Sequence, residues 1–149
     1  MTIPNLNEFL TEDHHRLDEF LESFQERKAG NPVEAAEFLM RFTSALQRHL
    51  LWEETILFPL FEQKTGQSGL TDTLRAEHEE IREWLAALGE KVQESDADSD
   101  GEVDRLVNEL GGHNAREEYA LYPQLDSLLN AAEKQAALEA MSAIPEGTS

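Results

Sequence analysis

Hydrophobic residues recur at alternating steps of three and four along four long stretches of the chain, the spacing of one face of an α-helix. The first stretch is predicted to run from Pro4 or Asn5 to about Ala29. Its core-facing stripe consists of Leu10, His14, Leu17, Leu21 and Phe24. The neighbouring His15 falls among polar residues, so the spacing predicts that His14 points into the protein and His15 into solvent.

Three further helices follow from the same spacing. The second begins after the capping residue Asn31 and reaches about Lys64, the third runs from about Asp72 to Glu94, and the fourth ends near Leu128. The stripe of the second helix comprises Leu39, Phe42, Leu46, His49, Glu53, Ile56 and Leu60. That of the third comprises Leu74, His78, Ile81, Leu85, Leu88 and Val92. That of the fourth comprises Val103, Leu106, Leu110, His113, Glu117 and Ala120.

Four long helices joined by short loops favour an all-α fold, an up-down-up-down antiparallel four-helix bundle. A shorter amphipathic helix is predicted from Ala131 to about Ile144, followed by a tail over residues 145–149. With 149 residues, the chain is expected to form one domain, with the bundle over about residues 5–130.

The composition excludes several classes of function. Twelve lysines and arginines against 31 aspartates and glutamates give a formal net charge of −19, which repels nucleic acids and anionic membranes. We interpret the acidity as solvated helix faces, with an acidic docking surface as the alternative. The chain has no cysteine, and therefore no disulfide, zinc-finger or iron–sulfur site. No signal peptide or long apolar segment is apparent, so we expect a soluble, cytoplasmic protein.

A repeat of 64 residues relates the polar residues of the predicted core. It carries His14 onto His78, His49 onto His113, and Glu53 onto Glu117. In both halves the sequence Glu-Glu-x-x-Leu follows, and it ends in Phe-Pro in the first half and Tyr-Pro in the second. Four of the five histidines therefore obey one repeat.

Burying four imidazoles and two carboxylates in an apolar core is costly unless a shared partner satisfies them. A metal centre is such a partner, and a polar network within the core is the alternative. Residues four apart share one helix face, so His49 with Glu53 and His113 with Glu117 can each engage the centre from one helix. Four nitrogens and two carboxylates suit two ions bridged by both carboxylates, with an open position on each ion. Such ligands favour iron, then manganese, then zinc.

The paired His…His-x-x-x-Glu arrangement resembles the hemerythrin-like (HHE cation-binding) domain over about residues 5–130. This resemblance implies a four-helix bundle around a non-haem centre of two iron ions joined by an oxo or hydroxo bridge. The implied terminal ligands are His14, His49, His78 and His113, and the implied bridging ligands are Glu53 and Glu117. The oxygen carriers of the family have a fifth histidine where this chain has Leu74 or Arg82, so the symmetric pattern resembles the bacterial branch.

The resemblance implies binding of oxygen, nitric oxide or a related small oxidant at an open iron position, for sensing, storage or detoxification. The alternatives are a di-iron oxidoreductase that turns over peroxide or nitric oxide, and a protein that handles iron. Whether the protein is an enzyme, and which electron donor it uses, stays open in the sequence. The expected partner is a diatomic molecule or peroxide.

Three further residues near the predicted site attract interest. Tyr119, two residues after Glu117, is a candidate for a phenol in the vicinity of the metals, although we do not count it as a ligand. Gly111 and Gly112 precede His113 within a predicted helix, where glycine is unfavourable. They predict either a local bend or the close approach of a neighbour or small ligand.

Overall fold

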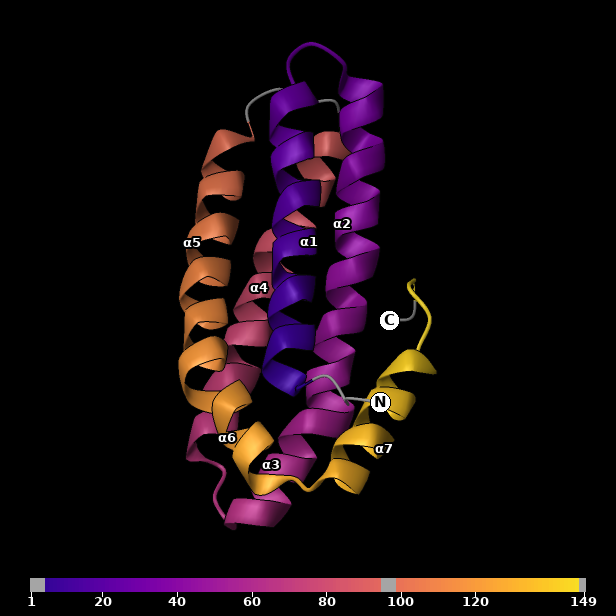
Figure 1. The fold of residues 1–149 in the computed structure, drawn as a ribbon. Coiled ribbons are helices and arrows are strands. Elements are labelled where there is room, and N and C mark those ends of the chain that lie inside the picture. Colours follow the sequence, from indigo (N-terminus) through magenta and orange to yellow (C-terminus); the bar gives the residue numbers. More distant parts are fainter. Residues whose placement is uncertain (1–4, 95–98, 148–149) are drawn as a thin grey trace.

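The computed structural model describes residues 5–94 and 99–147, and these residues form helices and no β-strand. Four long helices lie alongside one another (Figure 1): α1 (Leu6–Arg27), α2 (Pro32–Trp52), α4 (Gly69–Gln93) and α5 (Asp100–Arg116). The shorter helices are α3 (Phe58–Thr65), α6 (Tyr122–Leu128) and α7 (Ala131–Ser142). Two π-helical segments connect α2 to α3 and α5 to α6: η1 (Glu53–Leu57) and η2 (Glu117–Leu121). The predicted all-helical fold class is confirmed.

Asparagine side chains cap three of the helices at their N-termini. Asn5 accepts a hydrogen bond from the backbone N–H of Glu8, and Asn31 caps α2 in the same way, directly before Pro32. Asn130 opens α7 with a reciprocal capping box. The observed helix ends lie within a few residues of the predicted ones, while Pro4 lies outside the described residues.

Both halves of the chain leave the α-helical register at the same position of the repeat. The backbone N–H of Phe58 donates to the carbonyl of Glu53, five residues back, and the N–H of Tyr122 donates to the carbonyl of Glu117. Pro59 and Pro123 follow directly. Because a proline ring clashes with the carbonyl four residues before it, the wider π-turn accommodates these prolines within an otherwise continuous helix.

Each π-turn inserts one extra residue and therefore rotates the following side chains. The predicted core positions Ile56, Leu60 and Ala120 are only partly buried, although Ile56 and Leu60 still pack against the edge of the core. The residues buried in their place are Leu57, Phe58 and Phe61 in the first half and Leu121, Tyr122 and Leu125 in the second. The stripes predicted before the two glutamates are buried as expected.

Two apolar clusters form the core. One packs the ends of α1, α2, α4 and α5 that lie away from the π-turns, around residues such as Phe24 and Phe42. The other surrounds the π-turns and includes Trp52 and Met141, whose backbone carbonyl accepts a 2.9 Å hydrogen bond from the Trp52 indole. This contact fixes α7 against the last residue of α2. Within the described ranges, none of the helices has the length and apolar character needed to span a membrane.

Gly111 and Gly112 both lie inside α5, which runs unbroken from Asp100 to Arg116. A Cβ atom added at either glycine would meet no other atom within 4 Å. Of the two alternatives for these glycines, the close approach of a protein neighbour is therefore not found.

Replacing Gly112 by alanine is expected to raise the free energy of unfolding by about 0.5–1 kcal/mol, because Gly112 is exposed inside a helix and alanine restricts the unfolded chain. Denaturant unfolding of the metal-free protein measures this change. Gly66→Ala is the matched control and should lower stability, since Gly66 has a φ of 67° at the C-cap of α3. A destabilised Gly112→Ala variant would mean that the glycine is needed in the fold.

Candidate metal centre

The six candidate ligands converge from six elements onto one polar layer between the two apolar clusters. Each of the six is at most 2% exposed. The structure brings together all of the predicted site residues, which are His14 of α1, His49 of α2, Glu53 of η1, His78 of α4, His113 of α5 and Glu117 of η2. The exposed His15 is not among them, as the helical spacing predicted.

The six side chains form two overlapping groups that share both carboxylates. One group contains His14 and His49, the other His78 and His113, and each also contains Glu53 and Glu117. In each group the potential ligand atoms lie within 4.8 Å of one another. Two ions with two common carboxylates would therefore fit this layer.

Each shared carboxylate directs one oxygen toward each group. Glu53 Oε1 lies 2.9 Å from His78 Nε2, and Glu53 Oε2 lies 3.4 Å from His49 Nε2. Glu117 does the same, with Oε1 at 3.3 Å from His14 Nε2 and Oε2 at 3.2 Å from His113 Nε2. A bridging carboxylate needs this two-sided arrangement.

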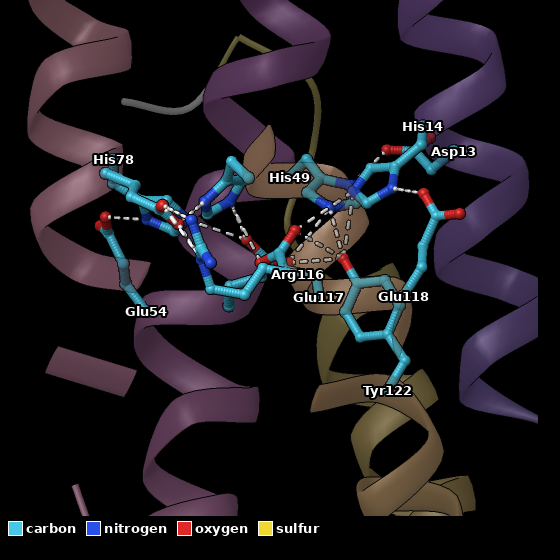
Figure 2. Close-up of polar contacts among 12 residues, drawn as sticks. Asp13, His14, His49, Glu54, His78, Arg116, Glu117, Glu118 and Tyr122 are labelled. Carbon is cyan, nitrogen blue, oxygen red and sulfur yellow. Dashed lines mark hydrogen bonds and ion pairs between the residues drawn. The ribbon is translucent and has the colours of Figure 1, made fainter. Parts of the chain in front are cut away.

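The other nitrogen of every imidazole contacts a second carboxylate. The distances from Nδ1 to the nearest carboxylate oxygen are 2.8 Å for His14 and Glu118, 2.8 Å for His49 and Asp13, 2.7 Å for His78 and Glu54, and 3.0 Å for His113 and Glu77. An Nδ1–H that donates to a carboxylate fixes the ring and leaves Nε2 for a metal. Figure 2 shows three of these outer acids around the layer.

The outer acids obey the same repeat of 64 residues, although the sequence reasoning did not identify them. Asp13 and Glu77 each precede a ligand histidine, and Glu54 and Glu118 each follow a shared glutamate. The doubled Glu-Glu and the acid before each histidine were the available signals. Their meaning depends on which helices lie side by side, because each acid contacts a histidine of another helix.

Arginines contact three of the outer acids, and Arg16 contacts Asp13 at 3.3 Å. Arg82 holds both oxygens of Glu54 at 2.8 Å, and Arg116 lies 2.7 Å from Glu77. Burial would raise the pKa of Glu54, but the hydrogen bonds from His78 and Arg82 lower it to about 2. Glu54 therefore stays ionised at neutral pH.

Tyr122 was missed by the sequence reasoning, and its hydroxyl lies beside the group of His14 and His49 (Figure 2). Its hydroxyl donates to Glu53 Oε2 at 2.6 Å and lies 3.1 Å from Glu117 Oε1. It also lies 3.1 Å from His14 Nε2 and 3.2 Å from His49 Nε2. Tyr119, the tyrosine that the sequence favoured, is 86% exposed and is not among the residues that contact the six candidate ligands. In an α-helix the second residue after Glu117 points away from the face of that glutamate, so Tyr119 lies outside the site, whereas η2 brings the fifth residue, Tyr122, to it.

Charge pairing dominates the layer in the metal-free protein. Burial alone would lower the pKa of His49, but Glu53 and Asp13 raise it to about 10. Burial would likewise lower the pKa of His113, but Glu117 and Glu53 raise it to about 11. Burial would raise the pKa of Glu53, yet the neighbouring imidazoles hold it well below its usual range.

Two buried polar atoms face each other without a hydrogen bond. His113 Nε2 and Glu117 Oε2 have no hydrogen-bond partner among the described residues. Both belong to the group that contains His78. Since buried polar atoms are normally hydrogen-bonded, this pair, which is joined only by an ion contact of 3.2 Å, fits a site built for an ion.

Metal binding should tighten as the pH rises. The raised pKa values of His49 and His113 leave both rings protonated at neutral pH, and a ligand imidazole must release the proton from its binding nitrogen. We expect the dissociation constant for Fe²⁺ or Zn²⁺ to decrease as the pH is raised from about 6.5 to about 8.5. Competition with a chelator of known pH dependence measures it, and a constant value would contradict the predicted proton release.

Replacing His14 by alanine should lower the metal content, whereas His15→Ala should leave it unchanged. Loss of an outer-shell partner alone costs about 10–100-fold in metal affinity, so loss of the buried His14 should cost at least that. Metal analysis after gel filtration compares the two variants with the wild-type protein. Equal losses from both would show that the exposed histidine also serves the metals.

Comparison with known proteins agrees with this geometry. The family model of the hemerythrin HHE cation binding domain matches residues 5–142. The chain is also 25% identical over 128 residues to an uncharacterized hemerythrin-like protein of Schizosaccharomyces pombe, a match that covers 84% of this chain and 61% of that protein. The chain therefore spans less than two thirds of the length of this relative. No solved structure matches the chain. From the family match over nearly its whole length, the chain belongs to the hemerythrin HHE cation-binding domain family.

Proposed function

We propose that the protein is a non-haem di-iron protein that binds oxygen, nitric oxide or a related small oxidant at an open iron position. The observation that supports this proposal is the sharing of Glu53 and Glu117 by two groups of ligands, each completed by two histidines. We further propose the up-down-up-down order of the four long helices, which their short connections favour. Sensing, storage and detoxification all use the same binding step.

The donor set favours iron over the alternatives. It offers imidazole nitrogen and carboxylate oxygen and no sulfur, which suits iron and manganese, while zinc prefers a closed tetrahedral site when its role is structural. Two nitrogens and two carboxylate oxygens on each ion leave room for a further ligand. When bound, a pair of iron ions supplies the electrons that hold a small oxidant.

The protein's own residues hold and tune this centre. The outer acids orient the four imidazoles through Nδ1. Trp52, Leu57 and Leu121 are buried in the cluster on one side of the layer and keep bulk water away from it. Such a dry surrounding limits the loss of a bound oxidant by side reactions with water.

A second candidate function is turnover of peroxide or nitric oxide. A groove of about 680 Å³ between α1 and α5 is lined by both His14 and Glu118. Glu118 is partly exposed and lies 2.8 Å from His14 Nδ1. This pair connects the centre with solvent, and turnover of peroxide needs such a supply of protons.

Iron analysis and rapid mixing distinguish these candidates. We expect two iron ions per chain. When the reduced protein is mixed with oxygen, a new absorption band should appear and persist for as long as oxygen is present. Removing the oxygen with argon should make the band disappear. The reason is that the open position binds the oxidant without a further reductant. One ion per chain at full occupancy would contradict the shared carboxylates.

A Glu53→Gln, Glu117→Gln double variant is the matched control. It keeps the volume of both side chains but removes the charges that bridge the two groups, so it should lose the paired site. Immediate decay of the band in the wild-type protein, with consumption of added peroxide, would instead support the oxidoreductase.

A further inference from the structure

The two halves of the centre differ at one residue that faces it. The repeat of 64 residues carries Phe58 onto Tyr122, and each follows its shared glutamate by five positions. The Phe58 ring lies 5.3 Å from the His78 ring, and the Tyr122 ring lies 5.6 Å from the His14 ring, measured between centroids. The two aromatic rings therefore occupy equivalent places, and only one of them carries a hydroxyl.

That hydroxyl contacts all four groups that could hold one of the two ions. It lies 2.6–3.2 Å from the Nε2 atoms of His14 and His49 and from one oxygen each of Glu53 and Glu117. Neighbouring ligands of an octahedral ion, with bonds of about 2.1 Å, are about 3.0 Å apart. The distances from the phenol oxygen to the other four atoms are therefore those expected of a fifth ligand of the same ion.

A purely structural role explains these contacts poorly. Tyr122 is completely buried, and its hydroxyl has one proton to donate. One carboxylate oxygen would satisfy that proton, yet the hydroxyl is surrounded by two carboxylates and two imidazoles, as Figure 2 shows. Phe58 fills the equivalent place without any polar atom, so the fold itself does not require a hydroxyl there.

We propose that Tyr122 is a seventh ligand, whose phenolate oxygen binds the ion held by His14, His49, Glu53 and Glu117. This inference rests on the proposed di-iron function. When the ion binds, the phenol O–H bond breaks, its proton is released to solvent, and the electron pair left on oxygen forms the bond to the metal. Neither metal nor protein is oxidised or reduced in this step.

The two ions then become chemically unequal. The ion on the side of His14 and His49 has an additional anionic ligand, while the ion on the side of His78 and His113 faces the Phe58 ring. The open position for a small oxidant consequently falls to the second ion. A symmetric set of histidines and glutamates thereby becomes an asymmetric centre through one hydroxyl.

Visible absorption and resonance Raman spectra of the iron(III)-loaded protein test this proposal. A phenolate bound to iron(III) gives a charge-transfer band in the visible region and enhanced vibrations of the phenolate ring. We expect both in the wild-type protein and expect Tyr122→Phe to abolish them while two iron ions per chain remain. Tyr119→Phe is the matched control and should keep the spectrum, since Tyr119 is exposed.

Phe58→Tyr provides a second variant that does not depend on the folding of Tyr122→Phe. A hydroxyl at this equivalent place should reach the other ion and strengthen the visible band. A wild-type protein with two iron ions and no phenolate signals would overturn the tyrosine ligand and leave the proposed function intact. So would signals that survive in Tyr122→Phe. A chain that takes up no iron would overturn both, and iron analysis separates this outcome from the others.

Discussion

The structure depends on neutralising six ionisable side chains in a buried layer. Burying an unpaired charge costs several kcal/mol, and this layer contains four imidazoles and two carboxylates. Every imidazole therefore has an acid at Nδ1 and a shared carboxylate near Nε2. In the metal-free protein this pairing raises the pKa values of His49 and His113 far above that of free histidine. The same groups that stabilise one another without metal are those that metal ions would take over.

Charges alternate outward from this layer, and three of the eight arginines in a chain with a net charge of −19 take part. Arg82 contacts Glu54, Arg116 contacts Glu77, and Arg16 contacts Asp13. In the described part of the chain, Glu118 has no arginine partner of this kind and instead opens to the groove between α1 and α5. The surplus of acid is therefore partly a requirement of the centre, since every buried histidine needs its own carboxylate.

The sequence predicted the fold class and all six converging residues, because the steps of three and four hold along α1, α4 and the first part of α2 and α5. The same periodicity separated His14 from His15. It failed after Glu53 and Glu117, where the π-turns add a residue that no hydrophobic pattern announces. Hence Ile56 and Ala120 were placed in the core, and Tyr122 was not recognised as facing the site. The outer acids were also missed, since their contacts join residues of different helices.

The π-turns determine which side chains face the candidate metal centre. In an unbroken α-helix the fourth residue after each shared glutamate would lie on the same face as that glutamate. With one residue inserted, the fifth faces the centre instead, and this residue is Phe58 in one half and Tyr122 in the other. Pro59 and Pro123 follow at once, and the wider turn relieves the clash that each ring would make with the carbonyl four residues before it, so that the chain continues as α3 and α6. The backbone thus fixes which position meets the ligands, and a single hydroxyl at that position is enough to make two otherwise matching halves different.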